Sequence, residues 1–494
     1  MDCPGLARAG RVTAAHPFDG LARNFVAGEW REGDGGGRIK VEDPATEEVV
    51  LEAAIAGNES LASALTAARA HVERRTLADM LPLERAAMLR RIAAEIRELA
   101  PEGSVLLSRE SGKRLEDAQA EFAEAANYFE YYSGLADKIE GRSIPLGPGT
   151  SDFTVLEPYG ISAQIIPWNY PVSLAARSLA PALAAGNCAI LKAPELDPAA
   201  LLMLGHAIER ADVPKGAVSI LNGYGTELGA SLAASSQIDQ IVFTGSVATG
   251  QAILQAAAET VTPALVELGG KSAAIAFADA DADALIESVK WGIFNNAGQV
   301  CSAMSRLLVH RSRHQETVER LVAMAGSLSI GDGLSNHDHT PQISAAQLNR
   351  VEAMVSRACS EGKRAVTGGN RIDRTGHFMA PTILDNVDPT SAIAQQEVFG
   401  PVLCVIPFDS EDEAVTIANG TEFGLVAGVF TRDIGQALRS ANRLRAGQVF
   451  VNRWFAGGIQ TPFGGVGKSG FGREKGVEAL ANYVRTKNIA IALD

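Results

Sequence analysis

The chain has 494 residues, of which 46% are hydrophobic and 21% are charged, and its formal net charge is −14. This length exceeds what one hydrophobic core usually supports, so we expect two or three lobes. The acidic balance argues against nucleic acid as a partner, because phosphate binding needs a basic face, and no apolar run has the length of a membrane span. The five cysteines include no CxxC pair, which is typical of free thiols in a reducing compartment and predicts a cytoplasmic location.

The N-terminal segment carries Arg8, Arg11 and Arg23 with few acids, and it lacks the apolar stretch of a secretory signal. We interpret residues 1–23 as a flexible leader, with an organelle presequence as the alternative. Gly and Pro later interrupt a helical pattern in residues 141–149, where we expect a protruding element. The elements predicted around that break are a hairpin over 24–32, helices over 60–73, 83–99 and 116–133, and a strand over 153–158.

From Gly160 onward, apolar runs of strand length alternate with helical patterns. This alternation predicts a parallel sheet with helices on both faces, and such sheets bind ligands at the carboxyl ends of their strands. The predicted strands are 161–166, 189–192, 218–221, 240–243 and 265–268, and the helices are 172–185, 198–211, 228–234 and 247–260. A second series predicts another lobe, with strands over 273–277, 307–310, 402–407, 426–430 and 449–451 and helices over 284–295, 316–328, 345–360, 412–419 and 434–444.

Two glycine-rich turns between strand and helix compete for the phosphates of a cofactor. Gly223, Gly225 and Gly229 nearly match the dinucleotide fingerprint, but one residue too many precedes the third glycine. The turn Thr244-Gly245-Ser246 lacks the Gly-Lys-Ser/Thr of a P-loop, yet the N–H groups of a helix that begins near Ser246 could hold a pyrophosphate. Either turn alone is weak evidence for a site.

Several chemically useful side chains follow the predicted strands. Asn169 lies just past one predicted strand, Lys192 and Glu195 lie just past the next, Glu267 ends the last strand, and Cys301 lies in the loop FNNAGQVCSAMSR. A lone cysteine is more often a small buried hydrophobe, and a lone glutamate is more often solvated. Together, these residues supply a thiolate nucleophile, a carboxylate that can activate water, an amide that can donate to an oxyanion and a carboxylate that can bind ribose.

The strings PWNYP, LKAPE, FTGS, VELGGKS, GQVCSA, EVFGP and PFGG occur in this order along the chain. In order and spacing they resemble the motif series of the NAD(P)-dependent aldehyde dehydrogenase superfamily, over nearly the whole chain from about Asn24. The resemblance implies an α/β fold with a Rossmann-like cofactor domain, an α/β catalytic domain and a small β oligomerisation element, in a homodimer or homotetramer. The ranges it implies are 24–135 and 151–266 for the cofactor domain, 267–467 for the catalytic domain, and 136–150 with 480–494 for the oligomerisation element.

The resemblance also implies a reaction in which Cys301 attacks the carbonyl of a small aldehyde. The Asn169 amide and the Cys301 N–H hold the oxyanion, hydride leaves to the nicotinamide, and Glu267 activates the water that hydrolyses the thioester. Because similar enzymes that transfer the acyl group to coenzyme A generally lack this glutamate, we expect the acid as product. A catalytically retired binding or structural protein is the alternative of another class.

The motifs carry over a set of cofactor contacts as well. Lys192 and Glu195 would bind the adenosine ribose, and the carboxylate of Glu195 would repel a 2′-phosphate, so NAD is expected to be preferred over NADP. The full set implied for the cofactor is Ile166, Trp168, Lys192, Glu195, Gly225, Gly229, Thr244, Gly245, Ser246, Glu397 and Phe399.

The clearest departure from the family pattern is Arg177-Ser178, where many relatives have an aromatic residue followed by lysine. That lysine is often assigned to a proton relay with a glutamate that matches Glu474, so Ser178 puts the relay in doubt. Arg177 with Ser or Ala is similar to enzymes for benzaldehyde-like substrates, and we expect Arg177, Trp454 and Phe455 to line the substrate tunnel. We therefore predict an aromatic or otherwise apolar aldehyde, with an anionic semialdehyde second and a cationic aldehyde disfavoured.

The histidines do not suggest a metal site. His310 and His314 have helical spacing without the glutamate of a zinc motif, and His337 and His339 lie in a polar loop. We predict no metal.

Overall fold

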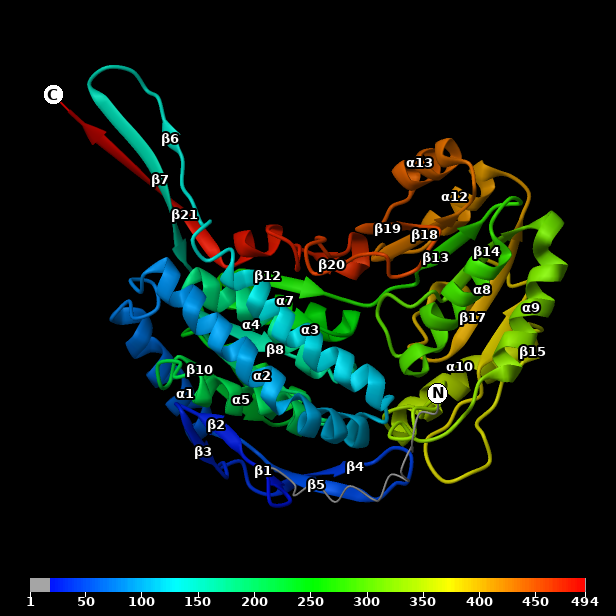
Figure 1. Ribbon diagram of the computed structural model, residues 1–494, viewed down its shortest axis with the longest axis horizontal. Helices are drawn as coiled ribbons and strands as arrows, with labels where there is room; N and C mark the ends of the chain where they lie inside the picture. The colour runs from blue at the N-terminus through cyan, green and yellow to red at the C-terminus, as the bar shows by residue number, and fades with distance from the viewer. Residues whose placement is uncertain (1–17, 494) are drawn as a thin grey trace, which may run out of the picture.

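The computed structural model describes residues 18–493. Two α/β lobes lie side by side, and a narrow arm of strands projects from the first lobe (Figure 1). Among the described helices, none is both long and apolar enough to cross a membrane.

The first lobe is organised around an eight-stranded sheet in the order β20-β12-β11-β8-β9-β10-β2-β3. Its five central strands are parallel, and the order reverses between β8 and β11, which is where ligands of such sheets bind. The short antiparallel strands β2, β3 and β20 complete its two edges. The strands are β2 (Asn24–Val26), β3 (Glu29–Arg31), β8 (Ile161–Ile165), β9 (Cys188–Ala193), β10 (Val218–Asn222), β11 (Gln240–Thr244), β12 (Ala264–Glu267) and β20 (Gly470–Phe471).

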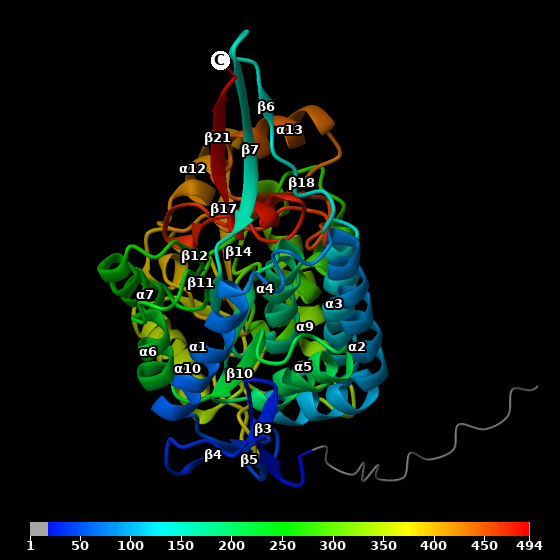
Figure 2. The same cartoon turned by 90° about the vertical axis from the view of Figure 1, so that its left-hand side faces the viewer.

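Helices cover both faces of this sheet. In Figure 2, α1, α6 and α7 lie on one side and α2, α3, α4 and α5 on the other. Helix α4 is rich in alanine and leucine, has Pro171 in its first turn and ends at Gly186, whose φ of 92° suits glycine. The helices are α1 (Asn58–Glu73), α2 (Pro82–Ser111), α3 (Leu115–Ser133), α4 (Pro171–Ala185), α5 (Pro198–Arg210), α6 (Ala230–Ala233) and α7 (Val247–Thr260).

The second lobe contains a seven-stranded sheet in the order β15-β16-β17-β14-β13-β18-β19, parallel except for β15. The strands are β13 (Ala273–Ala276), β14 (Arg306–His310), β15 (Arg364–Thr367), β16 (Thr382–Asp385), β17 (Val402–Phe408), β18 (Val426–Phe430) and β19 (Gln448–Val451). The helices are α8 (Ala282–Val289), α9 (His314–Ser327), α10 (Ala345–Ser360), α11 (Ala392–Gln395), α12 (Glu411–Asn419) and α13 (Ile434–Arg443).

The arm is a three-stranded antiparallel sheet in the order β21-β7-β6 that stands clear of both lobes (Figure 1). It consists of β6 (Ser143–Ile144), β7 (Thr150–Pro158) and β21 (Val484–Ala492), with β7 and β21 paired along their whole length. Residues 151–158, which we expected in the cofactor domain, therefore belong to this arm. The boundary was wrong because β7 continues beyond the glycine-rich break as the partner of the C-terminal strand.

The leader is shorter than expected. Phe18 is buried, and strand β1 (Leu21–Ala22) pairs with β5 (Val49–Ala54), which pairs in turn with β4 (Arg38–Glu42). Residues 18–23 are thus part of the fold, because Leu21 and Ala22 bury apolar side chains, whereas residues 1–17 lie outside the described residues.

Three predicted helices also differ from the observed ones. Helix α2 continues past Pro101 to Ser111, because its second half is buried. The helix predicted over 228–234 is a π-helical turn at Gly225–Gly229 followed by the short α6. The helix predicted over 284–295 ends at Val289 and continues as a π-helical turn at Lys290–Phe294. Glycines within both turns weaken regular helix formation.

Candidate active site

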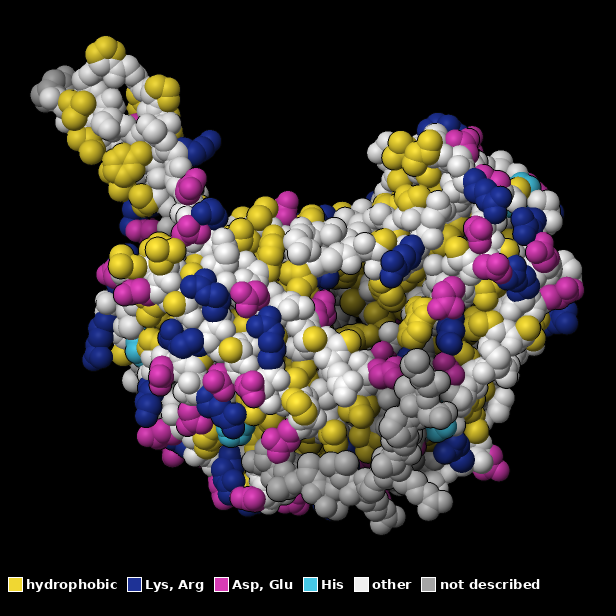
Figure 3. All heavy atoms as spheres, viewed as in Figure 1, with side chains coloured by type: hydrophobic (Ala, Val, Ile, Leu, Met, Phe, Trp, Pro, Cys, Tyr) yellow, Lys and Arg dark blue, Asp and Glu magenta, His cyan; other side chains and the backbone are white. Residues whose placement is uncertain are grey.

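Two cavities meet at Asn169 and Cys301, between the two lobes. The first, of about 150 Å³, lies at the carboxyl ends of the parallel strands and includes the turn Thr244–Ser246. The second, of about 280 Å³, lies on the other side of Cys301 among side chains of α3, α4 and the loops near the C-terminus. Figure 3 shows a hollow in the surface between the two lobes. The thiol is therefore the point that both cavities share.

The loop that carries Cys301 has an unusual backbone. Asn296 and Ala297 have φ values of 48° and 52°, and Gly298 follows with a φ of 74°. Gly270, which follows β12 of the first lobe, lies directly against this loop. A Cβ at this position would lie 2.6 Å from the Cys301 carbonyl oxygen, so glycine permits the close approach. Burial raises the pKa of the Cys301 thiol to about 11, although the nearby charge of Arg177 acts in the opposite direction.

Asn169 is held in place beside the thiol by a buried polar network. Its Nδ2 donates to the Gln299 carbonyl oxygen at 3.1 Å, which leaves its second amide proton for another acceptor. The Asn169 carbonyl oxygen accepts from Lys113 Nζ at 2.9 Å. Lys113 is ion-paired with Glu121, whose carboxylate accepts from the Val172 and Ser173 N–H groups at the start of α4. These contacts fix a donor where an oxyanion would form.

The carboxyl group of Glu267 is buried outside the two cavities. Glu267 ends β12 and is 2% exposed, and neither carboxylate oxygen has a hydrogen-bond partner among residues 18–493. It is packed against backbone, since a Cβ at Gly464 would lie 2.8 Å from Glu267 Oε1. Burial, and then the negative charge of Glu474, raise the pKa of Glu267 well above its usual range. The structure thus places this carboxyl near Glu474, and it lines neither cavity.

Arg177 is engaged by Glu474. The two side chains form an ion pair and are 7% and 2% exposed. Ser178 Oγ donates to the other carboxylate oxygen of Glu474 at 3.1 Å. Burial by itself lowers the pKa of Arg177, but Glu474 and the other acidic groups nearby together outweigh it, so the pKa is raised and the guanidinium stays charged. Ser178 therefore contacts Glu474 at the position where many relatives have lysine. The positive charge beside Glu474 comes instead from Arg177.

The first cavity brings together most of the residues predicted for the cofactor. Trp168 and Phe399 meet edge to face with ring centroids 5.2 Å apart. Glu397 Oε1 accepts from the Gly270 N–H at 2.9 Å. Ser246 begins α7 and caps it by accepting from the Thr249 N–H, so the free N–H groups of this helix face the cavity end of β11. The predicted residues that line this cavity are Trp168, Asn169, Thr244, Gly245, Ser246, Cys301, Glu397 and Phe399, and Gln347 and Arg350 join them.

The other predicted cofactor residues cluster at the ends of β9 and β10. Lys192 Nζ is ion-paired with Glu195, and a Cβ at Gly225 would lie 3.9 Å from Glu195 Oε1. Ile166 is buried, and its N–H donates to the Lys192 carbonyl oxygen at 3.1 Å. A Cβ at Gly229 would meet nothing within 4 Å, so close packing does not explain this glycine. The carboxylates of Glu195 and Glu397 can each accept from a ribose hydroxyl, and the start of α7 can hold a pyrophosphate. Together these groups fit a dinucleotide.

The second cavity has an aromatic wall. Tyr128, Phe450, Phe455 and Phe463 line it, together with Leu174. Trp454 does not line it, contrary to our expectation. Its ring is 4% exposed, and its Nε1 donates to the Ser302 carbonyl oxygen at 3.1 Å. Trp454 therefore packs behind the thiol loop, because its ring fills the core of the second lobe while the neighbouring Phe455 turns outward.

Charged residues also line this cavity, and two of them have no counterpart in the sequence prediction. Besides Arg177, the lining includes Glu124 of α3 and Lys475, which follows Glu474. Lys475 Nζ lies 4.0 Å from Glu124 Oε1. Only the packing of the C-terminal loop against α3 brings these residues together, so the sequence contains no local signal for the pair.

Comparison with known proteins adds to this geometry. A model described as the aldehyde dehydrogenase family matches residues 30–489. The chain belongs to the aldehyde dehydrogenase family. It is 40% identical over 476 residues to the peroxisomal aminoaldehyde dehydrogenase 1 of Pisum sativum, with 94% of each chain covered.

Solved structures agree with this assignment. This aldehyde dehydrogenase is similar to a putative aldehyde dehydrogenase from Burkholderia cenocepacia, with a TM-score of 0.93 and 41% identity over 96% of this chain and 100% of that one. It is also similar to betaine aldehyde dehydrogenase from Staphylococcus aureus in complex with NAD⁺, with a TM-score of 0.94 and 35% identity over 96% and 95% of the chains. The predicted family and fold class are confirmed.

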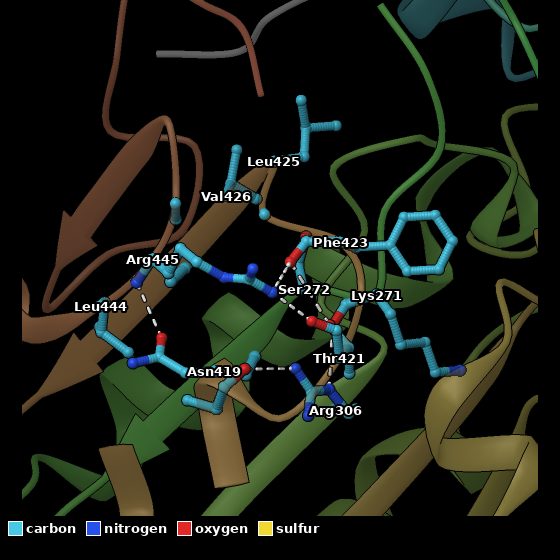
Figure 4. A pocket seen from close by; sticks show the side chains of 15 residues that line it. Lys271, Ser272, Arg306, Asn419, Thr421, Phe423, Leu425, Val426, Leu444 and Arg445 are labelled. Carbon is cyan, nitrogen blue, oxygen red and sulfur yellow. Dashed lines mark hydrogen bonds between the residues drawn. The ribbon is translucent and has the colours of Figure 1, made fainter. Parts of the chain in front are cut away.

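A further pocket in this aldehyde dehydrogenase is structural. It lies in the second lobe and holds only about 10 Å³, too little for a ligand. Figure 4 shows the guanidinium of Arg306 directed at backbone carbonyl groups. Arg306 donates to the carbonyl oxygens of Lys271, Ile417 and Ala418 at 2.7–2.9 Å, and Arg445 is bonded to Thr421. These contacts join β14 to the end of α12.

The histidines considered above have ordinary partners. His314 Nε2 is bonded to Asp385 at 2.8 Å, and His339 Nε2 to the Met379 carbonyl oxygen at 2.8 Å. Among residues 18–493, no cluster of three metal-binding side chains occurs. The absence of a metal stays a prediction.

Proposed function

We propose that this aldehyde dehydrogenase uses NAD to oxidise an uncharged aromatic or otherwise apolar aldehyde to its carboxylic acid. The observation that supports it is the second cavity, in which aromatic rings surround the approach to Cys301 and each acidic group already has a cation beside it. When bound, NAD supplies the acceptor for the hydride.

The chain's own residues suggest how the reaction proceeds. The Cys301 sulfur adds to the aldehyde carbon as the thiol proton leaves to solvent, and the free Asn169 amide proton donates to the resulting oxyanion. Loss of hydride leaves a thioester on Cys301, and a water activated by Glu267 releases the acid and restores the thiol. Since Glu267 is buried beside Glu474, its side chain must rotate toward Cys301 for this step.

The cavity argues against the cationic substrates named for several relatives. The relatives from Pisum sativum and Staphylococcus aureus are aminoaldehyde and betaine aldehyde dehydrogenases. Here Arg177 and Lys475 both line the cavity, and the carboxylates of Glu474 and Glu124 lie beside them. A cationic substrate would lose hydration without gaining a free counter-ion, whereas an aromatic ring would bury apolar surface against Phe455 and Phe463.

An anionic semialdehyde is the second candidate substrate. Lys475, rather than Arg177, is the residue that supports it. Arg177 is neutralised by Glu474, so its charge is poorly suited to bind a substrate carboxylate. Lys475 makes no hydrogen bond within the described part of the chain and lines the same cavity. A retired protein is disfavoured, because Cys301, Asn169 and Glu267 are all present and the first two share both cavities.

We further propose a homodimer or homotetramer. The arm extends away from both lobes and exposes Leu146, Ile491 and Leu493, which suits burial against a second copy of the chain. Its strands β6 and β21 form the two edges of the arm sheet. Size measurement by light scattering would choose between the two states.

A substrate panel tests the proposed function. NADH formation by the purified protein would be followed with benzaldehyde, hydroxybenzaldehydes, aliphatic aldehydes, succinic semialdehyde and betaine aldehyde. We expect benzaldehyde-type substrates to give the highest kcat/KM. In Cys301→Ala, turnover should fall by a factor of about 10³ or more, because no other nucleophile reaches both cavities. A wild-type preference for betaine aldehyde, or turnover that survives in Cys301→Ala, would refute the proposal.

A further inference from the structure

Lys475 projects into the second cavity from an unusual backbone position. Its φ is 62°, a left-handed conformation that is unfavourable for a residue with a side chain. Two backbone hydrogen bonds between Phe463 and Glu474, each 2.7 Å, and one from the Gly476 N–H to the Ile459 carbonyl oxygen hold this turn. The turn is held on both sides of Lys475, so the direction in which its side chain leaves the backbone is defined.

The acid opposite Lys475 is also fixed. Glu124 Oε1 accepts from the Tyr128 hydroxyl at 3.3 Å, and Oε2 accepts from Ser173 Oγ at 2.7 Å. Lys475 Nζ lies 4.0 Å from Oε1, outside hydrogen-bond distance, and among residues 18–493 it makes no hydrogen bond. The ammonium therefore neutralises Glu124 through space while keeping its own N–H donors available to the cavity.

The surroundings of Lys475 favour a direct effect on the substrate. Its side chain is 18% exposed, and its Nζ lies 5.9 Å from the centroid of the Phe463 ring, which also lines the cavity. The charged side chains that act on it are Glu124, Glu474 and Arg177, and the Cys301 thiol is the other titratable group nearby. Arg177 also lines the cavity but is paired with Glu474, whereas Glu124 and Lys475 lie 4.0 Å apart without a direct hydrogen bond.

We propose that Lys475 is a specificity-determining residue that excludes cationic aldehydes by occupying the place beside Glu124 that a substrate cation would need. The same ammonium attracts an anionic oxygen, carboxylate or phenolate, at the end of the substrate remote from the aldehyde. This inference rests on the proposed aldehyde oxidation and names the residue that selects among aldehydes.

Lys475→Met tests this role through ratios of kcat/KM. Each ratio would compare a charged aldehyde with benzaldehyde measured on the same variant, so that a general loss of activity cancels. We expect the betaine aldehyde ratio to rise about fivefold to tenfold and the 4-carboxybenzaldehyde ratio to fall by a similar factor, the effect of removing one partly screened charge. For 4-hydroxybenzaldehyde, the ratio should fall only at pH values where its hydroxyl is ionised, which separates phenolate from carboxylate binding.

Two further variants serve as controls. Lys475→Arg keeps the charge and should keep both ratios near those of the wild type. In Lys475→Met/Glu124→Gln, the gain for betaine aldehyde should disappear, because the carboxylate that the lysine had neutralised is gone. If the ratios in Lys475→Met stay unchanged, or both shift in the same direction, Lys475 has no charge-selective role.

The two proposals fail in different ways. A wild-type enzyme that oxidises betaine aldehyde more efficiently than benzaldehyde would refute the proposed substrate class. A wild-type enzyme that prefers benzaldehyde, with charge ratios that ignore Lys475, would refute only the role of Lys475. Melting temperatures of all variants would show whether each is folded.

Discussion

The two cavities that meet at Cys301 are built in different ways. The first is formed by strand ends, a glycine turn and the start of a helix, and its polar groups are largely backbone atoms or side chains next to strand ends. The second is formed by helix faces and C-terminal loops, and its character comes from aromatic and charged side chains. In the proposed function, the first would serve any aldehyde, whereas the second would determine which aldehyde reaches the thiol. Substitutions in the two regions should therefore have separable effects.

Outside Cys301, the largest effect is expected at Glu267, which we propose as the general base and which lines neither cavity. Glu267→Gln should lower steady-state turnover by a factor of about 10² or more for every aldehyde, because hydrolysis of the thioester loses its general base. The first turnover forms NADH before this step, so rapid mixing should show a burst of about one NADH per active site. A loss that differs strongly among aldehydes would place Glu267 in substrate selection instead.

A smaller effect is expected at the ion pair of Arg177 and Glu474, whose arginine lines the second cavity. Arg177→Met leaves the buried carboxylate of Glu474 without its cation and should lower the free energy of unfolding by about 3 kcal/mol. The double variant Arg177→Met/Glu474→Gln removes both charges and should regain most of this loss. Urea denaturation would measure both variants.

The same variants examine the original interpretation of Arg177 as a substrate-binding residue. If the double variant recovers stability and keeps the wild-type ratio of carboxylated aldehydes to benzaldehyde, Arg177 serves the pair with Glu474. If that ratio falls strongly, the guanidinium binds substrate despite its partner.

The fold was predictable where one short segment carries the signal. The parallel strands of both lobes follow from apolar runs, and Thr244, Gly245 and Ser246 lie where a strand gives way to a helix. The full extent of β7 was not predictable, because its partner β21 lies at the other end of the chain. The same applies to Leu21 and Ala22, whose pairing with β5 orders residues assigned to the leader.

The same contrast between local signals and contacts between distant segments applies to the site. Asn169 and the predicted cofactor residues mostly stand near strand ends, and Cys301 stands in a loop with a distinct motif, so local patterns in the sequence could point to them. Glu124 and Lys475 come from distant segments, and the location of Trp454 in the core rather than in the tunnel depends on how its loop packs. Local patterns therefore described the chemistry common to the family better than the cavity that selects the substrate.

The smallest effect is expected at Glu195, which lies just past β9 and lines neither cavity. Its carboxylate is 37% exposed and paired with Lys192, so its repulsion of a 2′-phosphate is partly screened. Glu195→Gln should raise kcat/KM for NADP by about fivefold relative to NAD, because the repulsion is removed while Lys192 remains to attract the phosphate. The order in which the enzyme prefers its aldehydes should not change with either cofactor. A wild-type enzyme that already uses both cofactors equally would contradict the role of Glu195, and a changed aldehyde order would show that the two cavities are coupled through Cys301.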